Sequence, residues 1–408
     1  MNGKSALAHF GAFDMENYGD LLYPMIFEQM LRKRGEARQI QQFSLMGSES
    51  LQDSGYSTRP LQQLFSFWRK QPHRLIVGGG DVLRTDWNLV ASHYQSSRLP
   101  RKRPTLRFKL RQWRRHLLKQ PLDEIGKFRY QYMNYSAVGP FIIEPRRFSN
   151  PKSVAYCSCG VPFPFEKKVR HLVARAINQA VFVYVRDRQS RQTLVNAGVT
   201  REIHVAPDLI VALSDFFDPS VERKKGRDLL QQAGVDIRRN ILCVQSNPQP
   251  PETNEELLQQ LMAYQKRTAC EVVLLPLGQC HGDNAYLRQL AQASGGIFKY
   301  LELDSIFAMI ATLAACDVFI GTSMHGNITA FSFGIPHLFG PIPAAKCEGF
   351  LDVVNLPLEL KLKSWTEINQ KLDVVTGMKG QYFADRASVA KQRVNQTFDL
   401  LVQAVANA

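Results

Sequence analysis

The sequence feature that most constrains the fold is a repeated order of short apolar run, glycine-containing turn and helix start. "LIVGGGDVLR" at 75–84 and "DVFIGTSMHG" at 317–326 both follow this order. Short apolar runs bounded by glycine indicate buried strands. Such strands alternating with helices predict an α/β protein whose parallel sheets are covered by helices on both faces.

The alternation divides the chain into two units. We predict strands at 6–13, 74–77, 153–158, 181–186, 203–205, 241–245, 271–276, 298–303, 318–320 and 337–339, with helices such as 166–180 and 304–316 between them. Residues 214–240 are polar and contain a proline, which is typical of a domain boundary. We therefore predict two Rossmann-like domains facing across a cleft, 1–213 and 241–386. The stretch 214–240 is the predicted linker, and 387–408 a helix that packs back on the first domain.

The composition is that of a soluble globular protein, with 45% hydrophobic and 21% charged residues. No apolar run approaches the roughly 18 residues of a membrane span. The start, "MNGKSALAHFGAFD", resembles a first strand more than a signal peptide. The seven cysteines include no C-x-x-C pair or metal-ligand spacing, and most lie in apolar runs. This predicts reduced, buried thiols, no metal and a cytoplasmic protein.

Residues 98–119, "RLPRKRPTLRFKLRQWRRHLLK", hold ten Lys and Arg and no acidic residue. Without them the net charge of +15 falls to +5. A narrow apolar stripe at helical spacing is formed by Leu106, Leu110, Trp113 and Leu117. One hypothesis is a helix that attaches the protein to the anionic inner face of the membrane; the alternative is a helix packed on the domain with solvated arginines. Nucleic acid is disfavoured, because the basic excess is local and no recognition motif accompanies it.

Polar residues follow the first predicted strand, where Asn17, Gly19 and Asp20 stand at the start of a helix. Ordinary helix N-capping explains such residues, and the residues alone favour that interpretation. They are also candidates for the cleft, because ligands of open α/β sheets bind at the carboxyl ends of the strands.

Three glycines, Gly78, Gly79 and Gly80, follow the next strand and precede Asp81. Consecutive glycines allow close approach of a ligand or of another chain segment, and a binding role is slightly favoured over a tight crossing. The spacing is not that of a dinucleotide fingerprint or a P-loop. Asp81 either orients a hydroxyl or caps the helix.

Arg186 ends the strand at 181–186. An arginine at that edge can bind a carboxylate or phosphate with two parallel hydrogen bonds. The alternative is an ion pair with Asp187 or across the domains.

The second unit adds histidines and a lysine. His281 lies in a loop before a helix, and Lys346 follows the last predicted strand. His325 stands at a strand exit beside a helix N-terminus, where anions are favoured; its alternative is a core histidine. Together with Arg186 these residues predict a site for a small, strongly anionic ligand.

The order of these segments resembles the polysaccharide pyruvyl transferase family over nearly the whole chain. Each motif is weak alone, whereas their order and spacing are fairly specific. The matching segments are Gly19-Asp20, Gly78-Gly79-Gly80, Arg186-Asp187 with Ser190, Pro207-Asp208, His281 with Asp283, His325-Gly326, and Lys346. Residues from about 98 to 135 have no counterpart and form a predicted insertion on the acceptor side.

The resemblance implies a fold like that of GT-B glycosyltransferases. It also implies transfer of the enolpyruvyl group of phosphoenolpyruvate to two hydroxyls of a sugar in a polysaccharide or lipid-linked oligosaccharide. Phosphoenolpyruvate would be the donor, with no other cofactor. His325 and Arg186 would be catalytic. The donor would be bound by Lys346, Ser323, Met324, Gly326 and His281, and the acceptor side of the cleft would comprise Asp20, Asn17, Gly79, Gly80 and Asp81.

One position departs from the family pattern: Ser323 stands where the family usually has arginine, two residues before the histidine. Another cation must then hold the donor, or donor binding is weakened. Two other functions stay open, a GT-B-type nucleotide-sugar glycosyltransferase and a non-catalytic, membrane-associated member of a glycan assembly complex.

Overall fold

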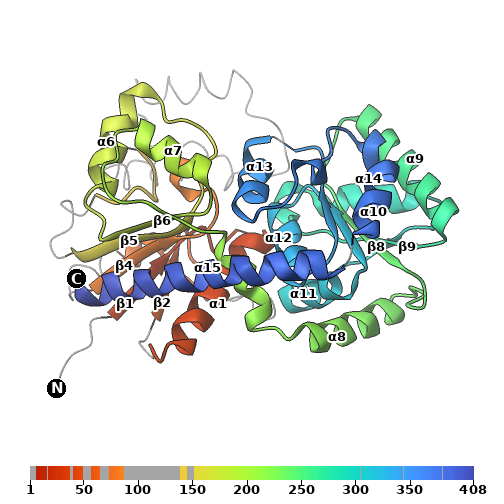
Figure 1. Ribbon diagram of the computed structural model, residues 1–408, viewed down its shortest axis with the longest axis horizontal. Helices are drawn as coiled ribbons and strands as arrows, with labels where there is room; N and C mark the ends of the chain where they lie inside the picture. Colours follow the sequence, from red (N-terminus) through yellow and green to blue (C-terminus); the bar gives the residue numbers. More distant parts are fainter. Residues whose placement is uncertain are drawn as a thin grey trace, which may run out of the picture.

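Two parallel β-sheets lie in separate halves of the chain, with helices packed around both (Figure 1). This computed structural model describes residues 6–15, 17–36, 40–48, 57–64, 73–86, 138–144, 151–303, 305–342, 344–378 and 380–408. The predicted α/β architecture of two Rossmann-like units is confirmed. The basic segment 98–119 and the predicted insertion 98–135 lie outside the described residues.

The first sheet has seven strands in the order β3-β2-β1-β4-β5-β6-β7, all paired in parallel. They are β1 (Ala6–Phe10), β2 (Ile40–Ser44), β3 (Arg59–Pro60), β4 (His73–Gly78), β5 (Pro151–Cys159), β6 (Phe182–Val185) and β7 (His204–Val205). The second sheet has five parallel strands in the order β10-β9-β8-β11-β12. They are β8 (Ile241–Gln245), β9 (Glu271–Leu274), β10 (Lys299–Tyr300), β11 (Val318–Gly321) and β12 (His337–Phe339).

Each sheet reverses its strand order once, between β1 and β4 in the first sheet and between β8 and β11 in the second. Open α/β sheets bind ligands in the crevice outside the carboxyl ends of the strands at such a point. Asn17 and Gly79 follow β1 and β4, whereas His325 follows β11. The topology therefore places most of the predicted site at the two reversal points.

The helices in the described residues are α1 (Tyr18–Lys33), α6 (Lys167–Ile177), α7 (Arg188–Asn196), α8 (Pro219–Gln232), α9 (Pro251–Thr268), α10 (Asp283–Ala293), α11 (Ile306–Ala315), α12 (Met324–Ser332), α13 (Ala344–Val353), α14 (Ile368–Gly377) and α15 (Gly380–Asn407). Short 3₁₀ turns include η1 (Val82–Arg84), η3 (Leu209–Asp215) and η4 (Gln279–His281). None of these helices combines the length and apolarity of a membrane span.

The two halves share one apolar core. It runs from α1 through η3 into the second sheet and continues beneath α12 and α15. The long helix α15 extends along both halves and ends beside the first sheet (Figure 1). Tyr18 on α1 adds a polar contact, since its hydroxyl lies 3.0 Å from Oγ1 of Thr329 on α12. These contacts hold the two sheet edges in a fixed relation.

The predicted linker 214–240 contains helix α8, which packs on α11 of the second half. Gly226 allows this close packing, because a Cβ there would lie 1.9 Å from the carbonyl oxygen of Ala311. The stretch is polar because α8 exposes most of its surface.

Two strands escaped the sequence-based prediction. β2 contains Gln41 and Gln42 and so lacks an apolar run. Gln42 is nevertheless buried, and its Oε1 is paired with Nδ1 of His9 at 2.9 Å. β3 has only two residues, too few for a pattern. The prediction also made β10 too long, since it spans Lys299–Tyr300 rather than 298–303.

All seven cysteines are free, and six are buried, as predicted. Cys280 is the exception. It is half-buried in η4 and lines the cleft described below.

Candidate active site

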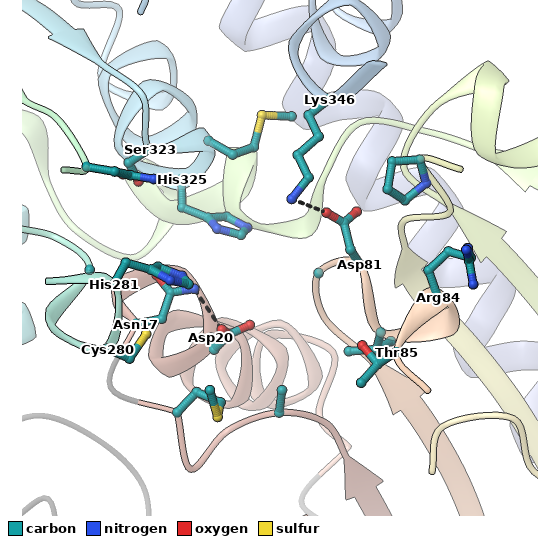
Figure 2. A pocket seen from close by; sticks show the side chains of 18 of the residues that line it. Asn17, Asp20, Asp81, Arg84, Thr85, Cys280, His281, Ser323, His325 and Lys346 are labelled. Atoms are coloured by element: carbon teal, nitrogen blue, oxygen red, sulfur yellow. Dashed lines mark hydrogen bonds and ion pairs between the residues drawn. The ribbon is translucent and has the colours of Figure 1, made fainter. Parts of the chain in front are cut away.

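A cleft of about 630 Å³ separates the carboxyl edges of the two sheets. Both halves contribute to its walls. Of the twelve predicted site residues, ten line it, namely Asn17, Asp20, Gly80, Asp81, Arg186, His281, Ser323, Met324, His325 and Lys346. Figure 2 shows several of these side chains converging on one space. Gly79 and Gly326 are not among the lining residues.

His325 lies in the first turn of α12 and is buried. Its Nε2 points toward Asp208, with 3.8 Å between Nε2 and Oδ2, and forms no hydrogen bond with the described residues. The Tyr23 ring meets the imidazole edge-on, with 5.6 Å between centroids. An imidazole nitrogen that is buried without a partner is costly, so it is a candidate for contact with a ligand or for proton transfer.

Gly19 on α1 packs directly against the imidazole of His325. A Cβ at Gly19 would lie 1.8 Å from Nδ1, far inside van der Waals contact. The sequence-based capping interpretation of this turn is wrong. Asn17 occupies the N-cap position without a side-chain cap bond, and Gly19 leaves the room that His325 needs.

We expect Gly19→Ala to displace either α1 or the His325 ring, because the added methyl group and the imidazole cannot share the space. Overpacking typically costs about 1–3 kcal/mol, and a shift of about 1 Å in a catalytic group can cost about a hundredfold in rate. Thermal unfolding and turnover should therefore both deteriorate. Gly377→Ala is the matched control, since no atom lies within 4 Å of its Cβ position. Wild-type turnover in Gly19→Ala would contradict the packing described here.

Asp208 is the buried carboxylate beside His325. Tyr23 donates its hydroxyl proton to Oδ2 at 2.5 Å, and the Ile210 amide donates to Oδ1. Burial alone would raise the pKa of Asp208, but nearby His325 and Arg186, together with the Tyr23 hydroxyl, hold it below its ordinary value. Asp208 therefore stays ionised.

Arg186 is buried among three carboxylates, with its side chain only 5% exposed. The shortest contact joins Nη2 to Oδ1 of Asp81 at 2.5 Å, while Asp208 lies at 3.4 Å and Asp187 at 3.9 Å. Burial would lower the pKa of Arg186, but Asp81 and Asp208 raise it. The Arg186–Asp187 ion pair raised as an alternative is present only as the 3.9 Å contact, whereas the closer partners Asp81 and Asp208, both in the first half, were not predicted. The role in donor binding stays a prediction.

Gly160 completes this ion pair. A Cβ there would lie 2.3 Å from Oδ1 of Asp81 and 2.8 Å from Nε of Arg186. Glycine is required so that the two charged groups can meet. Gly160 belongs to no motif noted in the sequence, and only the tertiary structure identifies it.

Lys346 reaches across the cleft from α13. Its Nζ lies 2.9 Å from Oδ2 of Asp81, and its side chain is 40% exposed (Figure 2). Asp81 makes no cap bond to η1, so the capping alternative is wrong. Burial would raise the pKa of Asp81, but Arg186 and Lys346 lower it.

Helix α13 of the second half also contacts α7 of the first half. This contact joins the two halves. Arg188 Nη1 lies 2.5 Å from Oδ2 of Asp352, and a Cβ at Gly349 would lie 3.1 Å from Cβ of Asp187. The Lys346–Asp81 ion pair is therefore one of several contacts that keep the halves together.

Asn17 and Asp20 form the lower wall in Figure 2, where the Asn17 amide donates to Oδ2 of Asp20 at 2.7 Å. Gly79 and Gly80 have positive φ angles of 95° and 65°, which favour glycine. The ring of Tyr23 would lie 2.9 Å from a Cβ at Gly79. The glycines thus serve a tight chain crossing, and Gly80 also borders the cleft.

The loop after β9 brings the second half to α1. The Tyr18 amide donates to the Leu277 carbonyl at 3.0 Å, and Asn17 pairs with Gly278. His281 lies in this loop, near Asn17 and Asp20 in Figure 2. Burial raises the pKa of nearby Asp283 to about 6.

Ser323 caps α12, because its Oγ accepts the Gly326 amide at 3.1 Å. Its own amide donates to Oε1 of Gln245 at 2.6 Å. Gly326 makes room for Leu277 and Phe319, each 2.7 Å from its Cβ position, so its missing side chain serves packing and not ligand approach. Met324 lines the cleft and packs against the core.

Tyr23, Gln245 and Arg84 also belong to this region, although none of them was predicted from the sequence. Tyr23 and Gln245 carry no motif; the one lies within a helix and the other ends an apolar strand. Arg84 lines the cleft, stacks on Phe165 at 5.6 Å and has no carboxylate within 4 Å among the described residues. Pro207-Asp208 was predicted to stand at a strand end and to match the family pattern, but Asp208 was not predicted to be a site residue.

The described residues contain no group of three or more His, Cys, Asp or Glu side chains suited to a metal ion.

Comparison with known proteins gives one family. The model of "Polysaccharide pyruvyl transferase" matches residues 17–339. A sequence search of curated proteins gave no significant match.

Several solved structures share the fold. UDP-N-acetylglucosamine 2-epimerase from Rickettsia bellii aligns with a TM-score of 0.56 and 10% identity over 99% of this chain and 97% of that one. The UDP-GlcNAc 2-epimerase from Neisseria meningitidis bound to UDP-GlcNAc aligns with a TM-score of 0.54 and 11% identity, over 99% of this chain and 100% of that one. Anabaena HepE in complex with UDP and glucose aligns with a TM-score of 0.52 and 13% identity, over 99% of this chain and 100% of that one. At these identities the likeness shows the GT-B fold alone.

Proposed function

The chain belongs to the polysaccharide pyruvyl transferase family, and from this premise we propose that it transfers the enolpyruvyl group of phosphoenolpyruvate to two hydroxyls of one sugar. The products would be a cyclic pyruvate ketal and inorganic phosphate. The observation that carries the proposal is the position of His325, buried in the cleft between the two halves with a ring nitrogen, Nε2, that forms no hydrogen bond within the described part of the chain.

The donor brings a carboxylate and a phosphate, and two cations are available for them. The ammonium group of the half-exposed Lys346 can leave Asp81 and bind a donor oxygen instead, and this costs little desolvation free energy because the side chain is already partly in solvent. Arg186 is held in place by its carboxylates, and its Nε is buried without a hydrogen-bond partner among the described residues. Such a preorganised cation can stabilise charge that develops on a leaving group.

Ser323 supplies no charge where the family usually has arginine, since its hydroxyl is used in capping α12. Arg84 is a further cation on the first-domain wall, and no carboxylate among the described residues neutralises it. We therefore expect donor binding to depend on Lys346 and Arg186, with Arg84 adding to the positive potential.

The chemistry has four steps. His325 protonates C3 of the donor, which leaves C2 electron-deficient. A sugar hydroxyl forms a bond to C2 and loses its proton; the C2–O bond to phosphate then breaks, and phosphate takes a proton. The second hydroxyl attacks C2, loses its proton and closes the ring. The imidazole of histidine can both donate and accept a proton, which suits such repeated transfers.

The proposal is tested with phosphoenolpyruvate and candidate polysaccharide or lipid-linked oligosaccharide acceptors. We expect stoichiometric phosphate release and a mass gain of one pyruvate ketal on the sugar. A thermal-shift panel separates the alternatives, because a ligand at a hundred times its Kd stabilises by about 2.7 kcal/mol. Stabilisation by nucleotide sugars alone would favour a glycosyltransferase, and stabilisation by no ligand would favour a non-catalytic scaffold.

We also propose, from the sequence alone, that residues 98–119 attach the protein to an anionic membrane surface. Each Lys or Arg near such a surface contributes about 1 kcal/mol, and salt screens the attraction. Vesicle co-sedimentation should therefore show binding to anionic vesicles that weakens at high salt. Equal binding to neutral and anionic vesicles, or none, would contradict this.

A further inference from the structure

We propose that Asp20, which follows the Gly19 that packs against His325, is the base that removes the proton from the attacking acceptor hydroxyl. This inference rests on the proposed function and adds a second proton-transfer residue to it.

The proton balance of the reaction requires more than one transfer. Two O–H bonds of the sugar break, one C–H bond forms at C3, and the departing phosphate takes up one proton. His325 can donate one proton and later accept one. A second group must accept the other hydroxyl proton and release it to the departing phosphate or to solvent. A carboxylate within reach of the hydroxyl is suited to this role.

Among the described residues, the carboxylates of Asp20, Asp81 and Asp208 interact electrostatically with His325, and the latter two are already paired with cations. Asp81 contacts Arg186 and Lys346, and Asp208 contacts Arg186. Both are therefore weak bases, because their partners favour the ionised form. Asp20 forms no ion pair with any described residue.

The position of Asp20 fits a contact with the acceptor. It lies in the first turn of α1, one residue after the Gly19 that touches His325. The side-chain amide of Asn17 donates a hydrogen bond to Oδ2 of Asp20 at 2.7 Å, which orients the carboxylate. Oδ1 has no hydrogen bond to the described residues and faces Gly80, whose Cβ position lies 3.4 Å away. Figure 2 shows the side chain pointing into the space below His325 and Asp81.

The electrostatic surroundings agree with this role. Burial raises the pKa of Asp20, and Asp81 and Asp14 raise it further, whereas the Asn17 hydrogen bond and His325 lower it. The net pKa is raised, so Asp20 is a stronger base than its two neighbours. It must still be ionised to act, and activity should therefore fall as the pH drops through its pKa.

Asp20→Asn tests the assignment, since the amide oxygen can still accept from Asn17 and the shape is kept. We expect kcat to fall at least a hundredfold while phosphoenolpyruvate affinity stays within threefold of the wild type. Any residual activity should lack the acidic limb of the wild-type pH profile. Glu28→Gln on the same helix is the control; it removes only an ion pair with Arg32, and its activity should be unchanged.

Asp20→Ala adds a second readout, because formate can fill the space and restore a base. Rescue by formate in this variant, and none in Asp20→Asn, is the expected result; it also carries the test if Asp20→Asn does not fold. Wild-type kcat in Asp20→Asn, or absence of rescue in a folded Asp20→Ala, would overturn the assignment. Failure of the wild type to release phosphate from phosphoenolpyruvate would instead overturn the proposed function, and Asp20 with it.

Discussion

His325→Ala is expected to lower ketal formation by at least a hundredfold while the protein remains folded. General acid–base catalysis by a positioned side chain typically contributes about 10²- to 10⁴-fold. The loss should appear in kcat, because donor affinity depends mainly on Lys346 and Arg186. Phosphate release measured over a range of donor concentrations separates the two parameters.

The matched control for His325→Ala is His171→Ala, which removes an exposed imidazole on α6, away from the cleft. Thermal unfolding of both variants shows whether the fold is kept. Turnover of His325→Ala within a few-fold of the wild type would mean that His325 is a core histidine, the alternative raised by the sequence.

Arg186→Met is expected to destabilise the protein by about 3–5 kcal/mol, because it leaves buried carboxylates without their partner. Asp208 is nearly inaccessible and Asp81 keeps only Lys346. Arg186→Lys should lower the free energy of unfolding by less, since lysine keeps the positive charge but cannot reach all three carboxylates. A role of Arg186 in donor binding, as its motif suggests, predicts weaker donor affinity. The buried ion pairs now predict a loss of stability as well.

The destabilisation by Arg186→Met should depend on pH. Asp81 and Asp208 have folded pKa values below the ordinary 3.8, so their contribution is present above that value and is lost as the pH falls through the folded pKa. Without the guanidinium, burial raises these pKa values, and the variant can neutralise its carboxylates by taking up protons. Urea unfolding at pH 7 and pH 5 should therefore show a smaller difference from wild type at pH 5. A difference that is equal at both values would show that packing, and not charge, is lost.

Much of the fold could be predicted because its signals are local. β8, "ILCVQ", is buried at all five positions, and a continuous apolar run indicates such a strand whatever surrounds it. β2 could not be predicted in this way, because it has no apolar run and the buried Gln42 side chain finds its hydrogen-bond partners in His9 and Pro24, distant in the chain.

The candidate site likewise has features that the sequence predicts and features that only the structure shows. Strand ends with glycine, histidine or arginine are visible in the sequence, and parallel strands bring their carboxyl ends to one edge, so ten of the twelve predicted residues line the cleft. What each side chain contacts could not be read from its neighbours. Arg186 matches the motif of an anion clamp, but three acidic residues from three different loops surround it.

By itself the sequence determined the two parallel sheets, the edge at which the site lies and the residue types available there, because these depend on burial patterns and turns within about ten residues. Only the tertiary structure decided that Gly19 makes room for His325 and that Asp81 joins Arg186 to Lys346 across the halves. It also decided that Asp20 has no ion-pair partner among the residues that the structure describes. The physical reason is that these contacts join residues far apart in the chain. Their distances are set by the packing of α1, α12 and α13 around a shared core, which no local pattern records.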